Sequence, residues 1–234
     1  MCLEEMKKHP IFPVELFTFE SSPELVEETL DALDPIERGN FNLPNTVQTT
    51  QGNLHCLPQF KNTFEWIDQC LDEVKKDQQF EMWGKFEVSL AWGVVSLPNS
   101  GGCHQPHRHP MSYYSGTYCL TDGYPTLFQD PVQARAYNQL EIISAVYENA
   151  VEAPVYKPGT LVIFPSWLVH FTAPHFADFV RANISFNAFP TGPINQGPYG
   201  QNMINCKLVQ DDELRRKGHG EEDIGYGHGP QMAL

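Results

Sequence analysis

The stretch GTLVIFPSWLVHFTAPH, residues 159–175, contains the clearest strand of the sequence and carries a histidine soon after it. Its first half is a run of bulky apolar residues, and neighbouring side chains of a strand point to opposite faces. Because both sets are apolar, we expect this strand to be buried on both faces. His170 follows the Pro165–Ser166 turn, so a polar ring lies next to a buried strand and needs a partner.

Short apolar segments separated by Pro, Gly and Asp lie on both sides of this strand in the sequence. They predict further strands over residues 85–98, 112–120, 126–130, 139–146, 153–157 and 180–189. Two earlier segments have helical spacing instead: residues 21–35, capped by Ser22, and residues 62–78, capped by Asn62. Helices followed by about seven strands predict a mainly β (α+β) fold, in which N-terminal helices brace one face of a β-sandwich or jelly roll.

A chain of 234 residues is long enough for one sizeable core, so we expect a single domain. Its core spans about residues 84–190, with residues 1–83 as helical support. Residues 208–234 are charged and rich in glycine, which is typical of an extended tail.

The formal net charge of −14 argues against duplex nucleic acid as a partner, because such binding needs a basic face. An anionic small molecule remains compatible with it, since one or two arginines define a local pocket. The six cysteines form no CxxC pair, and the opening MCLEEMKKHPIFPVELF lacks a secretory apolar core. We therefore expect reduced thiols and a cytoplasmic protein, and no apolar run is long enough for a membrane helix.

The first candidate site is the stretch CHQPHRHPMSYYSGTYCL, residues 103–120. Residues i and i+2 of a strand share a face, so His107 and His109 can occupy adjacent corners of one metal site. His104 is offset by three residues from His107 and is expected at the rim of such a site. A solvated loop rich in histidine fits this stretch equally well.

A second candidate site is the strand VRANISFNAF, residues 180–189. Arg181, Asn183, Ser185 and Asn187 alternate with apolar residues, which predicts one polar face within a core-like strand. A buried arginine needs an anion, either a bound ligand or an internal carboxylate.

Taken in order, HxH, SGTYCL, GTLVIFPSWLVH and then Arg181 resemble the Fe(II)- and 2-oxoglutarate-dependent oxygenases. The sequence looks most similar to their bacterial and phage branch with an HxHP…SGxYY signature, and the resemblance covers about residues 84–190. It implies a double-stranded β-helix, a cupin-like jelly roll that binds Fe(II), with 2-oxoglutarate as cosubstrate and O2 as oxidant.

The resemblance also implies roles for individual residues. His107 and His170 match the two histidine ligands of iron, whereas His109 stands where the family has Asp or Glu. Either His109 is itself the remaining ligand, or a carboxylate such as Asp130 takes that place; Asp130 also reads as a turn residue before Pro131. The ligands of the metal are the only catalytic groups expected.

For the cosubstrate, the resemblance implies that Arg181 binds the distal carboxylate of 2-oxoglutarate. Ser185 lies on the same face of that strand and is expected to add a hydrogen bond. Tyr118 or Thr117, on the predicted strand that follows the metal loop (residues 103–111), is expected to reach the same end of the cosubstrate.

The implied activity is hydroxylation of an unactivated C–H bond of a small molecule or an amino-acid or peptidyl side chain, with release of succinate and CO2. The alternative is a metal-binding, cupin-like isomerase or sensor that does not turn over 2-oxoglutarate. Arg181 distinguishes the two, because only the oxygenase needs it for 2-oxoglutarate. Helix faces outside the barrel are a candidate surface for a homodimer.

Overall fold

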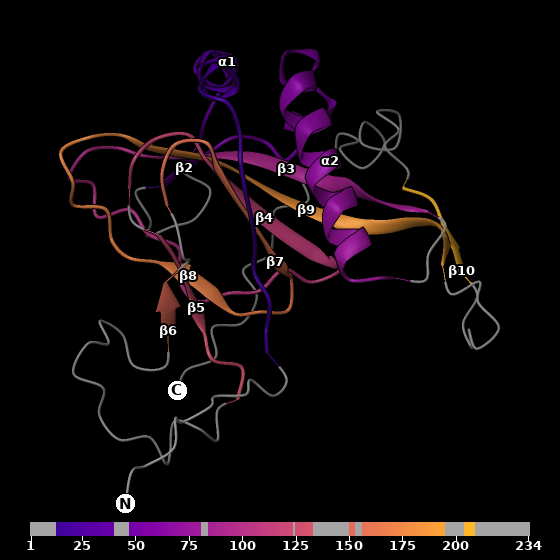
Figure 1. The fold of residues 1–234 in the computed structure, drawn as a ribbon. Coiled ribbons are helices and arrows are strands. Elements are labelled where there is room, and N and C mark those ends of the chain that lie inside the picture. Colours follow the sequence, from indigo (N-terminus) through magenta and orange to yellow (C-terminus); the bar gives the residue numbers. More distant parts are fainter. Residues whose placement is uncertain are drawn as a thin grey trace, which may run out of the picture.

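The computed structural model describes residues 13–39, 47–80, 84–123, 125–132, 150–152, 156–194 and 204–208 (Figure 1). The helices in these residues are α1 (Pro23–Leu33) and α2 (Lys61–Asp77), with short 3-10 helices at Leu54–Cys56 and Pro58–Phe60. The strands are β1 (Phe17–Glu20), β2 (Val47–Thr49), β3 (Lys85–Ser96), β4 (Tyr114–Cys119), β5 (Thr126–Gln129), β6 (Ala150–Glu152), β7 (Thr160–Pro165), β8 (His170–Thr172), β9 (Arg181–Ile194) and β10 (Ile204–Cys206).

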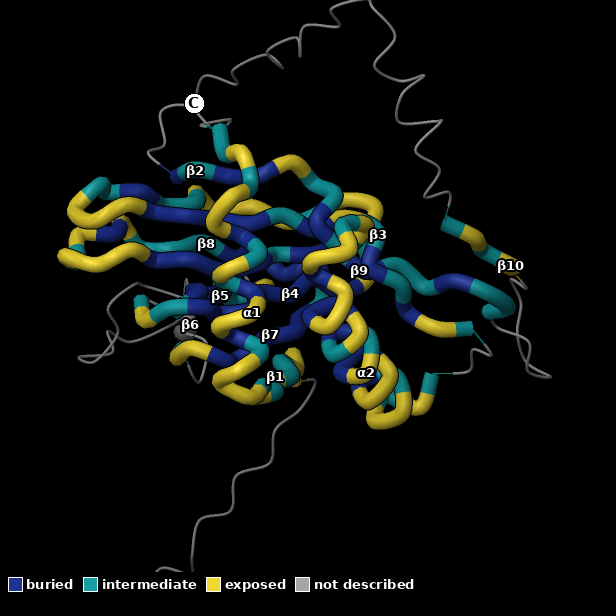
Figure 2. The backbone as a smooth tube through the Cα atoms, turned by 90° about the horizontal axis from the view of Figure 1, so that it is seen from above, coloured by how far each residue is buried: buried dark blue, intermediate teal, exposed yellow. Residues whose placement is uncertain are grey.

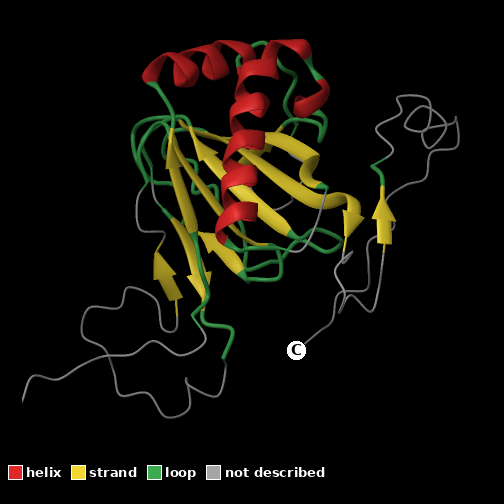
Figure 3. Ribbon diagram, turned by 45° about the vertical axis from the view of Figure 1, so that its right-hand side comes forward, coloured by secondary structure: helices red, strands yellow, loops and turns green. Residues whose placement is uncertain are grey.

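The strands form two antiparallel sheets. The larger sheet has the order β1-β7-β4-β9-β3-β2, with β10 added to β9, and the smaller sheet has the order β6-β5-β8. Both helices lie on one side of the larger sheet, and the smaller sheet lies on its other side (Figures 1 and 3). The predicted class, mainly β with N-terminal helices on one face, is confirmed.

Strand β7 separates two apolar cores. Leu161 and Ile163 belong to the cluster shared with both helices, whereas Val162 and Phe164 pack with Phe128 between the sheets. All four β7 side chains are at most 2% exposed, so the prediction that this strand is buried on both faces is confirmed. Figure 2 shows the buried strands inside and the exposed outer faces of the helices.

Helix α1 begins at the cap that its sequence predicts, whereas α2 does not. Ser22 caps α1, because its hydroxyl accepts a hydrogen bond from the Leu25 N–H (3.3 Å). Asn62 does not cap α2, because a 3-10 helix leads directly into a helix that begins at Lys61. The Asn62 side chain instead donates a hydrogen bond to Glu28 of α1 (2.7 Å), which joins the two helices.

Strands β3, β4, β5, β7 and β9 confirm the predicted segments, and β9 continues beyond its predicted end to Ile194. The short strands β1, β2, β6, β8 and β10 were not predicted. The segment 139–146 lies outside the described residues, as do most of 153–157 and the tail from residue 209 onward. The extended tail and the single-domain organisation stay predictions.

The cysteines that the structure describes form no disulfide with one another; they are Cys56, Cys70, Cys103, Cys119 and Cys206. The reduced state stays a prediction. In the described part of the chain, neither helix combines the length and hydropathy needed to cross a membrane.

Asp68 on α2 predicts a pH effect on stability. Desolvation raises the pKa of its carboxyl from 3.8 to about 6; Lys85 opposes the rise, and Asp72, Glu87 and Glu65 add to it. The folded protein therefore keeps a proton that the unfolded chain has released above about pH 4, so this group lowers stability as pH rises from about 4 to about 6, and the loss stays constant above that range. After allowance for solvent screening, we expect Asp68→Asn to stabilise the protein at pH 7.5 by about 1 kcal/mol. Thermal unfolding at pH 7.5 and pH 4 tests this, because the gain must vanish at pH 4.

Candidate metal centre

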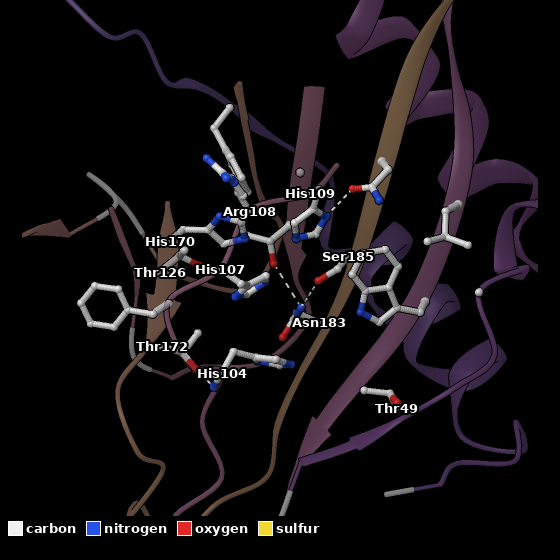
Figure 4. A pocket seen from close by; sticks show the side chains of 18 of the residues that line it. Thr49, His104, His107, Arg108, His109, Thr126, His170, Thr172, Asn183 and Ser185 are labelled. Atoms are coloured by element: carbon white, nitrogen blue, oxygen red, sulfur yellow. Dashed lines mark hydrogen bonds between the residues drawn. The ribbon is translucent and has the colours of Figure 1, made fainter. Parts of the chain in front are cut away.

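A cavity of about 1110 Å³ opens between the inner face of the larger sheet and the smaller sheet (Figure 4). The polar side chains of β9 line it together: Arg181, Asn183, Ser185 and Asn187. Their apolar neighbours in β9 belong to the core on the opposite, helix-covered face. The predicted polar face of this strand is therefore the floor of a pocket.

Three histidines meet in this cavity. His107, His109 and His170 each offer a ring nitrogen, and these three atoms lie within 4.8 Å of one another. Figure 4 shows the three rings gathered in the middle of the pocket. This is the only group of three or more such ligand side chains in the part of the chain that the structure describes.

Backbone pairing explains why residues so far apart in sequence meet. His107 and His170 exchange both of their backbone hydrogen bonds (3.0 Å each), so they are directly opposite in a short antiparallel pairing. Side chains of such a pair stand on the same face. His109 lies two residues farther on that face, and its N–H donates to the Ser166 carbonyl (3.0 Å).

Each of the three rings uses its Nδ1 atom for a hydrogen bond to a carbonyl oxygen. Because a carbonyl oxygen only accepts, Nδ1 carries the proton and the lone pair is on Nε2. Metal-binding histidines in proteins are oriented in this way. The acceptors are Gln105 O for His107 (2.7 Å), Asn187 Oδ1 for His109 (2.5 Å) and Leu168 O for His170 (3.0 Å).

The His109 ring is fixed on two sides. Trp92 of β3 stacks on it, with ring centroids 5.6 Å apart and planes at 25°. Asn187 Oδ1 accepts a second hydrogen bond from Ser115 Oγ (2.9 Å), which holds the amide in place. Trp92 thus forms part of the pocket wall, whereas Trp167 is 54% exposed and does not line the pocket.

Burial favours the neutral form of two of these rings, His109 and His170. Desolvation lowers the pKa of His170 from 6.5 to about 3, against a hydrogen bond to Leu168 that raises it. Desolvation also lowers the pKa of His109, although its hydrogen bond to Asn187 opposes the shift. Both rings therefore present a lone pair at neutral pH.

The candidate carboxylate Asp130 is not part of this cluster. Its Oδ1 accepts a hydrogen bond from the Val132 N–H (2.8 Å), which is the arrangement of a turn residue. No Asp or Glu lines the cavity among the described residues. The ligand set that the structure brings together is three imidazoles, and such a set suits Zn, Cu, Fe or Ni.

Arg181 lies in the same cavity and is 3% exposed. Its Nε donates to the Tyr156 hydroxyl (2.9 Å), and its guanidinium carbon lies 5.2 Å from the centre of that ring. None of the described ion pairs includes Arg181, so the structure shows no internal carboxylate partner for it. A buried, uncompensated arginine is costly, which indicates a site for an anion.

A small polar group lies on the cavity floor near Arg181. Asn183 Nδ2 donates to Thr117 Oγ1 and to Ser185 Oγ (3.1 Å each), as Figure 4 shows. Of the two residues expected from the strand after the metal loop, only Thr117 lines the cavity.

The expectation that Tyr118 reaches the cosubstrate is wrong. Its hydroxyl lies 2.7 Å from Ser21 Oγ, and its ring packs on Trp66 of α2 with centroids 5.1 Å apart. The reason is strand alternation: in β4, Thr117 faces the cavity and Tyr118 faces the helices.

His104 lies at the cavity rim outside the three-histidine cluster, as expected. Burial, with smaller contributions from His107, Arg181 and His109, lowers its pKa to about 4. The sequence did not reveal Tyr156 as the partner of Arg181 or Asn187 as the partner of His109. The alternating polar pattern of β9 marked Asn187 as facing the site, but its contact depends on where the metal loop lies.

The hydrogen bond between Asn187 and His109 leads to a test. We expect Asn187→Ala to weaken metal binding about 10- to 100-fold, because the variant loses the acceptor that orients the ring. Zn(II) or Co(II) affinity in competition with a chelator measures the effect. Asn183→Ala is the matched control, since Asn183 lies in the same strand and bonds Thr117 and Ser185 instead of a histidine. An equal loss in both variants would show general damage to β9.

Residues 90–187 match the model of a protein family described as "Putative 2OG-Fe(II) oxygenase". This segment contains the three histidines and Arg181. A search of curated protein sequences found no match.

Solved structures share the fold over most of this chain. HygX from Streptomyces hygroscopicus, solved with nickel and 2-oxoglutarate, aligns with TM-score 0.55 and 11% identity over 84% of this chain and 93% of its own. The carbocyclase SnoK from nogalamycin biosynthesis gives TM-score 0.59 and 14% identity over 87% and 86%. A Pseudomonas putida prolyl-4-hydroxylase gives TM-score 0.50 and 14% identity over 74% and 92%.

Identities this low show a shared fold, and the predicted jelly roll is confirmed. The family resemblance expected from the order of the motifs is confirmed as well, through residues 90–187. Residues 90–187 are therefore similar to the 2OG-Fe(II) oxygenases, a family named for its use of Fe(II) and 2-oxoglutarate.

Proposed function

We propose that this protein is a dioxygenase that uses Fe(II) and 2-oxoglutarate to hydroxylate an unactivated C–H bond of a small molecule or an amino-acid side chain, with release of succinate and CO2. One observation carries the proposal. A buried arginine without a carboxylate partner among the described residues shares a cavity with three histidines whose rings are oriented by hydrogen bonds.

The histidines fit an iron ion by their chemistry. Their Nδ1 protons are held by carbonyl oxygens, so His107, His109 and His170 would hold the metal through Nε2. Three protein ligands leave other coordination positions open, which a metal that reacts with a cosubstrate and oxygen requires. When bound, iron together with 2-oxoglutarate and O2 supplies the oxidising chemistry.

Arg181 is suited to the distal carboxylate of 2-oxoglutarate. Because its Nε is engaged by Tyr156, the two terminal nitrogens remain for a bidentate contact. Thr117, Asn183 and Ser185 lie beside it on the cavity floor and offer hydroxyl and amide groups to the same carboxylate. The protein thus pre-positions the cosubstrate before any reaction.

The rest of the cavity leaves room for a substrate. Its volume of about 1110 Å³ lies at the upper end of the range for small-molecule pockets. Leu90, Trp92, Phe164 and Phe171 give it apolar walls against which the apolar part of a substrate can pack.

The test is anaerobic addition of Fe(II) and then 2-oxoglutarate to the whole protein. A weak visible charge-transfer band must appear with both present and be absent with either alone. Succinate formation after admission of O2 is the second measurement. If the band never forms and the protein retains zinc or nickel with another anion, the cupin-like isomerase or sensor is the correct function.

Hydroxylation itself has a separate measurement, since SnoK, which shares the fold, is described as a carbocyclase. Once a substrate is found, reaction under ¹⁸O2 must place one labelled oxygen atom in the product. A product that forms with succinate but without label would assign the protein to another oxidative outcome within the same family.

A further inference from the structure

A second arginine, Arg108, lines the same cavity as the three histidines. It separates His107 from His109 in the chain, is exposed, and lines the same pocket (Figure 4). Among the described residues, no hydrogen bond or ion pair involves its guanidinium. Arg108 is therefore an available cation beside the candidate metal centre.

The charge of this cavity is opposite to that of the protein. The chain has 29 acidic and 15 basic residues, yet the described lining contains Arg108 and Arg181 and no Asp or Glu. A concave site lined by one sign of charge concentrates its field and attracts ligands of the other sign. The pocket thus selects anions from solution despite the net charge of −14.

The three-histidine ligand set increases this positive charge. A carboxylate ligand would offset one charge of the metal, whereas three neutral imidazoles offset none. Given the proposed function, on which this step rests, the 2-oxoglutarate dianion balances Fe(II) in total charge and leaves a surplus equal to the two arginines. Because Arg181 is buried on the floor of the cavity, it is assigned to the cosubstrate. The exposed Arg108 at the rim is then the arginine that remains for the substrate.

We propose that the substrate of this site is a small molecule with an anionic group, a carboxylate or a phosphate, which Arg108 binds at the mouth of the pocket. A polyanion such as a nucleic acid does not fit, because the rest of the protein surface repels it.

The experiment measures binding, so it is independent of turnover. The whole protein is loaded anaerobically with Fe(II), with and without 2-oxoglutarate, and titrated with hexanoate and phenyl phosphate. Hexanamide and benzyl alcohol serve as neutral matches. We expect the anions to bind at least 10-fold more tightly than the neutral compounds and to perturb the charge-transfer band when 2-oxoglutarate is present.

Two variants with the same change of charge locate the contact. Arg108→Gln must lose most of this preference for anions while its affinity for 2-oxoglutarate stays within about twofold of the wild type. Arg38→Gln removes an arginine outside the cavity and must bind the anions as the wild type does. Arg108→Lys must retain an intermediate preference, because it keeps the charge and loses the forked geometry.

The outcomes separate this inference from the proposed function. Equal binding of charged and neutral compounds, or equal anion binding by the wild type and Arg108→Gln, overturns the inference and leaves the oxygenase intact. A loss of 2-oxoglutarate affinity in Arg108→Gln assigns this arginine to the cosubstrate and also overturns it. If 2-oxoglutarate never binds but Arg108 still governs anion binding to the metal-loaded protein, the proposed function fails and the anion site stands.

Discussion

We expect His170→Ala to bind Fe(II) more than 100-fold more weakly than the wild type, with no metal retained after gel filtration. His170 is the buried member of the three-histidine cluster, and its loss leaves only the two ligands of the HxH segment, His107 and His109. Second-sphere changes alone weaken metal sites about 10- to 100-fold, so the loss of a direct ligand must exceed that. Metal content after anaerobic loading, and the rise in Tm on addition of metal, measure the effect.

His104→Ala is the matched control for this prediction. His104 is a histidine of the same cavity, but it lies outside the cluster, so its variant must retain metal. His107→Ala provides a second test should the buried site tolerate alanine poorly, because it removes a different ligand. His109→Asp must also retain iron, since a carboxylate is a proper ligand in that position. Retention of metal by both alanine variants of the cluster would contradict the assignment.

Arg181→Gln is expected to keep its metal and to lose about 10- to 100-fold in affinity for 2-oxoglutarate. A charge-assisted hydrogen-bonded contact contributes about 1.5–3 kcal/mol, which corresponds to this range. Anaerobic titration with 2-oxoglutarate, followed by the charge-transfer band, gives the affinity. Arg38→Gln, which removes the same charge elsewhere, must leave the titration unchanged.

Thermal unfolding of the same variant separates binding from structure. A buried arginine without a carboxylate partner costs stability, so Arg181→Gln without ligands must be at least as stable as the wild type. A structural salt bridge would give the opposite result, a loss of about 3–5 kcal/mol. The stabilisation that 2-oxoglutarate confers on the wild type must be much reduced in the variant, because ligand binding to the native state is what produces it.

The elements predicted from the sequence are those with strong local periodicity. The apolar run of β7 and the polar–apolar alternation of β9 each specify a strand and its faces without knowledge of any neighbour. The short strands β1, β2, β8 and β10 have no such signal, because they form only by pairing with the long strands. Their residues carry the pattern of loops.

By itself, the sequence determined the mainly β fold, the shared face of His107 and His109, the polar floor of β9 and the likeness to the 2OG-Fe(II) oxygenases. The tertiary structure alone decided which partners those side chains meet. It pairs His107 with His170, turns Tyr118 toward the helices and places Asp130 in a turn. The physical reason is that strand alternation depends on local sterics, whereas the register between strands depends on the pairing of segments distant in the chain.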